Sequence, residues 1–196
     1  MTAMQKPAAA AQLAQQAALS IRTARQEDFP AFFAYLNDHL ADNGIGPTAL
    51  FMPMPRQASS YPPERQGSFR NGVVTAVTEA GWRRLWLAWS PDGRIAGHID
   101  LRARGEAAAA HRALLGMGVQ RDFRRMGLGL QLIEHAVGWA RNDTALDWID
   151  LEVLSINTPA RGLYRAAGFV QTGEIEDLFR IDGESLGYTL MSRRVR

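Results

Sequence analysis

The segment from Gln120 to Trp139 constrains this chain most, because an arginine- and glycine-rich run leads directly into an apolar helical pattern. Arg124, Gly127 and Gly129 form the pattern R-x-x-G-x-G. Glycines lack a Cβ, so the backbone can turn tightly there and approach a ligand closely. The start of the following helix offers unpaired N–H groups and a positive dipole end, which suit a phosphate. The segment predicts a strand–turn–helix unit that holds a pyrophosphate.

Two common nucleotide-binding motifs are absent from this segment. No Gly-Lys-Ser/Thr follows the glycines, so it is not a P-loop. The glycine spacing also differs from the G-x-G-x-x-G of dinucleotide-binding folds. Taken alone, the residues are equally compatible with a glycine-rich turn flanked by solvated arginines, and a second motif is needed.

The segment from Leu151 to Val170 supplies it. A buried strand is expected to end just before Asn157, and Thr158-Pro159 then begins a helix as N-cap and first helical residue. That helix carries Tyr164 and is predicted to end at Gly168, a residue typical of the position after a helix. The next strand follows directly.

The two segments together resemble the Gcn5-related N-acetyltransferase (GNAT) superfamily. R-x-x-G-x-G is followed about 30 residues later by N-x-x-A-x-x-L-Y-x-x-x-G-F, a joint motif far more specific than either half. The resemblance extends over roughly Ile21 to Arg193 and is strongest from Leu114 to Val170. It implies acetyl-CoA as co-substrate and an α/β fold with a mixed, mostly antiparallel central sheet flanked by helices.

The order of predicted elements agrees with a mixed α/β sheet. Hairpin strands come early, a strand–helix–strand unit lies in the middle, and two strands end the chain. The expected strands are 20–25, 84–89, 94–102, 112–120, 147–155, 169–175 and 185–193, the last two separated by a loop with Asp182-Gly183. A helix is expected after Asp28, another from about Pro63 to Glu79, and a third to about Arg141. The second should point Phe69, Val73, Val74 and Val77 inward.

Composition restricts the class of protein. The chain has 196 residues, a formal net charge of +2 and no cysteine. This predicts one domain over 20–196, without disulfides or a basic face for nucleic acid. No apolar run is long enough to span a membrane, so we expect a cytoplasmic protein. The Ala/Gln-rich stretch 1–19 is expected to be a disordered or loosely helical extension.

The resemblance assigns the cofactor-binding residues by position. The turn residues hold the pyrophosphate, the preceding strand pairs with the pantetheine arm, and an asparagine after the next strand contacts the cofactor. These positions are Met117, Gly118, Val119, Arg124, Arg125, Met126, Gly127, Leu128, Gly129 and Asn157. Close strand packing is an alternative reason for Gly118, and a simple turn role for Asn157.

Acetyl transfer to an amine also needs a proton donor and a proton acceptor. Tyr164 matches the tyrosine that many family members use as general acid toward the thiolate; a core aromatic is the alternative. The base is less defined. His111 precedes the cofactor-binding strand, and Glu152 lies on the next strand, on the face opposite Ile149 and Leu151. His98 and Asp100 are candidates to line an acceptor pocket, although a structural role is favoured.

These residues predict an acetyl-CoA-dependent N-acetyltransferase acting on the primary amine of a small molecule. A protein or peptide acceptor and a non-catalytic acyl-CoA-binding module are the alternatives. The four histidines are not spaced as metal ligands, so no metal is expected. The ending resembles D-G-x-x-x-D-x-x-x-M of members thought to act on small amines, but Gly187 replaces the second acid. A homodimer through the C-terminal strands is possible.

Overall fold

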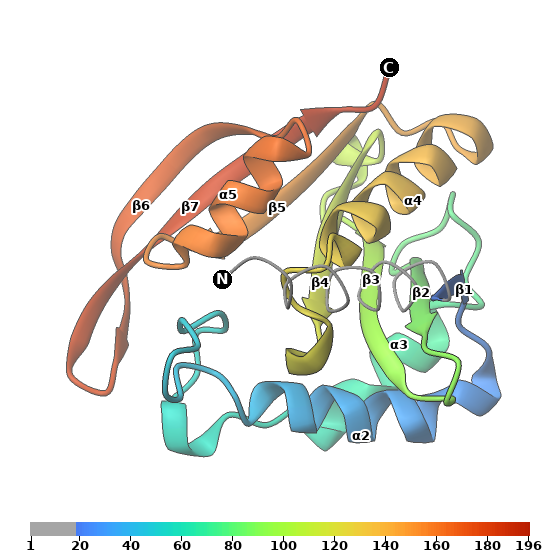
Figure 1. The fold of residues 1–196 in the computed structure, drawn as a ribbon. Helices are drawn as coiled ribbons and strands as arrows, with labels where there is room; N and C mark the ends of the chain where they lie inside the picture. Colours follow the sequence, from blue (N-terminus) through green and yellow to red (C-terminus); the bar gives the residue numbers. More distant parts are fainter. Residues whose placement is uncertain (1–18) are drawn as a thin grey trace, which may run out of the picture.

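A single twisted sheet organises the computed structural model, which describes residues 19–196. The predicted extension therefore lies almost entirely outside the described residues. Seven strands follow the order β1-β2-β3-β4-β5-β7-β6, and all neighbours are antiparallel except β4 and β5 (Figure 1). The strands are β1 (Ser20–Thr23), β2 (Arg83–Trp89), β3 (Ile95–Ala103), β4 (Arg112–Val119), β5 (Trp148–Leu154), β6 (Val170–Ile181) and β7 (Glu184–Arg194). The mixed, mostly antiparallel sheet confirms the predicted fold class.

Four α-helices cover the two faces of this sheet. They are α2 (Phe29–Leu40), α3 (Gln66–Gly72), α4 (Leu128–Asp143) and α5 (Thr158–Ala166). Leu132 and Ile133 of α4 pack on one face, in a core that includes Ile99 and Ile149. On the other face, α2 and α3 pack against the β2 end of the sheet. None of the helices among residues 19–196 is long and apolar enough to cross a membrane.

Side-chain alternation along the strands decides which face each residue occupies. On β4, Ala113 and Leu115 join the core beneath α4, so Arg112 and Leu114 lie on the opposite face. On β5, Ile149 and Leu151 face α4, which places Asp150 and Glu152 on the opposite face. We call this opposite face the acceptor face.

The sheet opens between its two halves. β4 and β5 pair only from Arg112↔Trp148 to Leu114↔Asp150, and no further pair forms between them in residues 19–196. Beyond Leu114, β4 stays paired with β3 as far as Val119, and β5 stays paired with β7. The C-terminal parts of β4 and β5 therefore no longer pair with each other, and we call this unpaired stretch of the sheet the splay.

Two sequence expectations were wrong. The helix predicted to about Glu79 ends at Gly72, and Val74 is 72% exposed instead of inward-facing. Gly72 and the β-branched residues that follow it all have low helix propensity. The last strands are also longer than predicted, because Asp182 and Gly183, both with positive φ, turn the chain within two residues.

Candidate active site

The turn between β4 and α4 has a backbone shape that depends on glycine. Gly127 is the N-cap of α4, with a left-handed φ of 80°. Arg125, two residues earlier, also has a positive φ, of 64°. Such conformations are uncommon outside glycine and concentrate at ligand-binding turns. The N–H groups of the first helical turn point out of this turn, so the residues present fit a pyrophosphate.

The two arginines of the turn have different surroundings. Arg124 donates from Nε to the Val119 carbonyl at 3.0 Å and from Nη2 to Asp42 at 3.1 Å. It therefore ties the turn to the end of α2. Arg125 is exposed, and residues 19–196 offer its side chain no ion-pair partner. Of the two, Arg125 has the guanidinium that is available to a phosphate.

Gly129 has a packing role that the motif alone does not reveal. A Cβ at this position would lie 2.8 Å from Cδ2 of Leu163 and 3.7 Å from the terminal carbon of Met117. The missing side chain therefore lets α5 approach the first turn of α4. This contact brings the turn, the end of β4 and α5 together around one side of the splay.

Asn157 caps α5. Its side-chain oxygen accepts a hydrogen bond from the Ala160 N–H at 3.3 Å, and the residue is 7% exposed. Thr158 and Pro159 are the first two residues of the helix, so the cap is Asn157 and not Thr158 as the sequence suggested. The bond fixes the position of α5 over the sheet.

Tyr164 lies on α5 within the core beneath α4 and α5. Its ring packs edge-on against Phe169 with centroids 5.9 Å apart. Burial raises the pKa of the phenol above its usual value, and the nearby Tyr188 raises it further. Tyr164 is therefore protonated at neutral pH, as a general acid must be before it reacts. No side-chain hydrogen bond engages its hydroxyl within residues 19–196.

The glycines of β4 contact a cluster of rings on the acceptor face. A Cβ at Gly118 would lie 2.7 Å from Nε2 of His39 and 2.8 Å from Cε1 of His98. The Tyr35 hydroxyl bonds His98 Nδ1 at 3.0 Å and the Gly118 carbonyl at 3.2 Å. Close packing is thus one reason for a glycine at position 118, and its contact with the cofactor stays a prediction.

Both histidines of this cluster are buried and uncharged. The pKa of each is lowered to about 3, mainly by burial; for His39 the neighbouring His98 and Arg124 also contribute. Asp100, on the same strand as His98, is buried against Arg83 and Arg102. These residues support the acceptor face from within. Among the described residues, no three or more His, Cys, Asp or Glu side chains gather as metal ligands.

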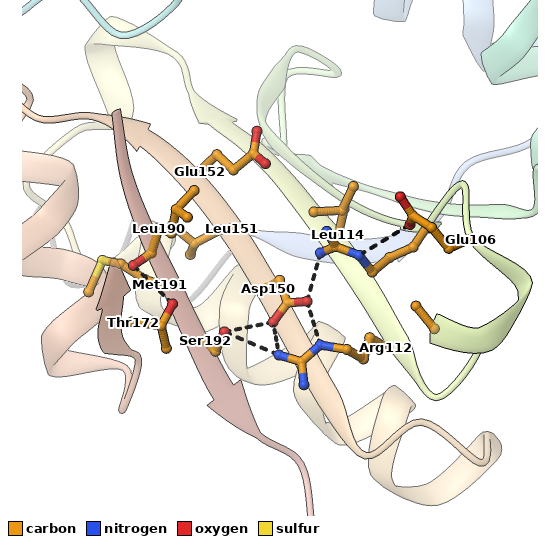
Figure 2. Close-up of a pocket in the computed structure, with 12 residues that line it drawn as sticks. Glu106, Arg112, Leu114, Asp150, Leu151, Glu152, Thr172, Leu190, Met191 and Ser192 are labelled. Atoms are coloured by element: carbon orange, nitrogen blue, oxygen red, sulfur yellow. Dashed lines mark hydrogen bonds and ion pairs between the residues drawn. The ribbon is translucent and has the colours of Figure 1, made fainter. Parts of the chain in front are cut away.

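A hollow of about 440 Å³ lies on the acceptor face beside the splay (Figure 2). Its size is within the range of small-molecule sites. Asp150, at its centre, accepts hydrogen bonds from Arg112, Arg104 and Ser192. Glu152 follows two residues later on the same strand, and its exposed side chain lines the hollow.

The two predicted base candidates lie in different places. Glu152 lines the hollow on the acceptor face. His111 precedes β4, at the end of the strand remote from the α4 turn, and its carbonyl accepts from the Asp147 and Trp148 N–H groups. It is exposed and does not line the hollow. The structure brings Tyr164, the turn and Glu152 around the splay, and leaves His111 outside.

Sequence reasoning missed the arginine–aspartate cluster of the hollow. Arg104, Arg112 and Asp150 come from three strands or strand ends, and no local motif joins them. One signal was available: Asp150 interrupts a buried apolar strand with a charge, next to the already noted Glu152. A buried charge within a strand requires a partner.

A second missed feature is the segment from Gly44 to Ser59, here called the strap. Asn43, fully buried, accepts from the Phe51 and Met52 N–H groups and donates to the Met52 carbonyl and the Ser59 hydroxyl. At the other end, Arg56 pairs with Asp182 and Glu184. The strap therefore connects α2 with the β6–β7 turn.

Known proteins share the sequence pattern of the elements that build this site. The family model described as "Acetyltransferase (GNAT) family" matches residues 50–169. The mycothiol acetyltransferase of Clavibacter sepedonicus is 32% identical over 117 residues, 58% of this chain and 36% of its own length. The chain thus spans about a third of that relative. The 5-NmdU N-acetyltransferase of Pseudomonas phage PaMx11 is 30% identical over 107 residues, 54% of this chain and 71% of its own.

Solved structures share the fold. A GNAT superfamily phosphinothricin acetyltransferase from Sinorhizobium meliloti, in complex with acetyl-CoA, superposes with a TM-score of 0.71 at 17% identity. The match extends over 90% of this chain and 88% of that one. The family match includes β4, the α4 turn, β5 and α5, the elements that build the site. The chain belongs to the acetyltransferase (GNAT) family.

Proposed function

We propose that this protein transfers an acetyl group from acetyl-CoA to the primary amine of a small molecule. One observation carries the proposal: the splay joins the glycine turn of α4 on one face to a hollow on the other. A phosphate-bearing cofactor bound at the turn and an acceptor in the hollow would meet at the splay.

The chemistry assigns roles to residues of both faces. Bound acetyl-CoA supplies the acetyl group as a thioester. The acceptor nitrogen forms the new C–N bond as the C–S bond breaks, and the nitrogen loses one proton while the sulfur gains one. Glu152 is the proposed proton acceptor on the side of the hollow. Tyr164 is the proposed donor to the sulfur, because burial keeps its phenol protonated.

Backbone groups hold the cofactor in this proposal. Gly127 and the first-turn N–H groups of α4 bind the pyrophosphate, with Arg125 adding charge. Met117 to Val119 line the open side of β4, where the pantetheine arm would lie. Arg124 bonds Asp42 and the oxygen of Asn157 bonds the Ala160 N–H, so we propose that both also position these parts of the site, beside any contact that they make with the cofactor.

A small acceptor is favoured over a protein by the strap. Leu50 is buried with Leu154, Ile181 and Leu186, and Arg56 pairs with two acids of the β6–β7 turn. The strap therefore closes one end of the acceptor face, whereas a peptide needs an open groove. The relatives' names mention different acceptors, mycothiol and 5-NmdU, so the comparisons leave the acceptor open.

The direct test measures thiol release from acetyl-CoA with a panel of amines and short peptides. Release that depends on a small amine, and that falls about 100-fold or more in Glu152→Gln, is the expected result. Glu134→Gln is the matched control, since Glu134 is an exposed acid on α4, away from the hollow. Acetyl-CoA binding without release over the whole panel would favour a non-catalytic module.

A further inference from the structure

Charge is distributed unevenly along the hollow. Asp150 receives two guanidinium groups, Arg112 at 2.8 Å from Nε and Arg104 at 2.8 Å from Nη1. Glu106 is a weaker second partner, 3.9 Å from Arg104 Nε and with a 73% exposed side chain, so solvent screens it. This end of the hollow is formally neutral, but its one buried carboxylate faces two guanidinium groups and its second acid lies in solvent, whereas Glu152 makes the other end negative.

Arg104 has donors to spare at this end. Its Nη1 bonds Asp150, but Nη2 has no hydrogen-bond partner among residues 19–196, and 29% of the side chain is exposed. A guanidinium offers five N–H donors in a planar fork that matches a carboxylate or phosphate. Asp150 holds the fork in place, and Ser192 and Arg112 hold Asp150. The group is thus preorganised at the wall of the hollow.

We infer that the acceptor amine carries an anionic group, a carboxylate or a phosphate, which Arg104 binds while the amine approaches Glu152. This inference rests on the proposed function and narrows its substrate class. Glu152 lies two residues beyond Asp150 on the same strand, which corresponds to roughly 6–7 Å. The acceptor therefore holds its amine and its anion several ångströms apart, and a polyamine is a poor fit because its second cation meets Arg104.

The geometry also separates Arg104 from Arg112 as a target for mutation. Arg112 makes two bonds to Asp150, contacts Ser192 and lies over the Trp148 ring at 4.9 Å. Its loss would leave a buried carboxylate short of partners and weaken the fold. Arg104 makes a single bond to Asp150, so Arg104→Gln removes the anion-binding fork while Arg112 still neutralises Asp150.

The test compares matched amines with and without an anion. Glycine, β-alanine and 4-aminobutyrate are each compared with the corresponding amide, O-phosphoethanolamine with ethanolamine, and spermidine is the polycation. We expect about 10- to 100-fold higher kcat/KM for an anionic amine than for its neutral partner, the range for a charge-assisted hydrogen bond. The carboxylate and phosphate arms show which anion is recognised.

Variants then assign the effect to Arg104. Arg104→Gln should remove most of the preference by raising KM for the anionic amines, and Arg104→Lys should restore part of it; the readout is the ratio of kcat/KM between each anionic amine and its neutral partner. Arg180→Gln on β6, an exposed arginine paired with Asp177, is the matched control and should change nothing.

The affinity for the amines tests the inference independently of acetyl transfer. Calorimetry with the CoA-loaded protein measures the affinity for each amine of the panel, whether or not acetylation occurs. Binding of anionic amines that Arg104→Gln weakens supports the inference even if no thiol is released, a result that would count against the proposed function alone. Two results would overturn the inference. In one, turnover or binding favours neutral amines or spermidine; in the other, no anionic amine of the panel binds or reacts.

Discussion

The two faces of the splay hold their ligands in different ways. On the α4 face, the proposed cofactor site consists mainly of backbone: a left-handed glycine, first-turn N–H groups and the unpaired side of β4. On the acceptor face, the site consists of side chains that come from β3, β4, β5 and β7 and meet at Asp150. A backbone site requires a short local pattern of glycines, whereas a side-chain site can change its specificity one residue at a time.

The largest expected effect lies at the junction of the two faces. Tyr164→Phe removes the proposed proton donor but keeps the ring that packs on Phe169. We expect kcat to fall about 100-fold or more while acetyl-CoA still binds, because general acid catalysis contributes roughly 10²–10⁴-fold. Initial rates of thiol release give kcat, and calorimetry gives the Kd of acetyl-CoA.

Tyr188→Phe is the matched control for this change. Tyr188 is a half-buried tyrosine close to Tyr164, and burial raises its pKa as well. Its loss should leave kcat within a few-fold of the wild-type value. Equal rates in Tyr164→Phe and the wild type would return Tyr164 to the role of a core aromatic.

Removing the hydrogen bonds that hold the strap should destabilise the acceptor face and leave the cofactor face unchanged. Asn43→Ala removes a fully buried side chain and the four hydrogen bonds that it makes with the strap. We expect the free energy of unfolding to fall by about 2–4 kcal/mol, since each hydrogen bond contributes roughly 0.5–1.5 kcal/mol. Urea denaturation measures the change.

Asn37→Ala provides the comparison. Asn37 accepts one bond, from the Tyr61 N–H, in an exposed position, and its removal should cost about 1 kcal/mol or less. If the faces are independent, the stabilisation gained from acetyl-CoA stays the same in Asn43→Ala. A loss of acetyl-CoA affinity there would show that the strap also holds the cofactor turn, and the division between the faces would be wrong.

The cofactor face can be perturbed through backbone alone. Gly127→Ala and Gly93→Ala both place a Cβ at a φ of about +80°, in a cofactor turn and in an exposed hairpin turn. Each should lose roughly 1–2 kcal/mol of stability, the cost of the left-handed conformation. Only Gly127→Ala should also weaken acetyl-CoA binding, by about 10-fold. Thermal unfolding with and without acetyl-CoA separates the two effects, and equal losses would indicate strain alone.

The difference between the faces also explains what could be read from the sequence. The turn and α5 lie within two short segments, so R-x-x-G-x-G and N-x-x-A-x-x-L-Y predicted them in order and place. Arg112 and Arg104 are 38 and 46 residues from Asp150, and no local pattern records that contact. The splay itself depends on where β4 and β5 stop pairing. Gly187 replaces the second acid of the family ending and does not line the hollow; a Cβ there would lie 3.2 Å from Ser155 Oγ and 3.5 Å from Glu174 Oε1.

The smallest expected effect concerns the pH dependence of the acceptor face. His39 stacks on Phe51 with centroids 4.7 Å apart, and its buried Nδ1 has no partner in residues 19–196. Its pKa in the fold is about 3, lowered first by burial and then by the charges of His98 and Arg124. In the unfolded chain the value is near 6.5. Only the unfolded state therefore takes up a proton as pH falls from about 6.5 toward 3, and stability falls over this range.

His39→Phe should remove part of this slope without removing a hydrogen bond. Each buried histidine contributes up to about 1.4 kcal/mol per pH unit, and His98, whose pKa is also about 3, keeps its share. Urea denaturation between pH 6.5 and 5 measures the slope above the range in which carboxylates titrate. Tyr35→Phe, which removes the bond to His98 but no titrating imidazole, is the control and should retain the wild-type slope. An unchanged slope in His39→Phe would mean that the fold does not lower the pKa of this imidazole, and that His39 can take up a proton on the acceptor face.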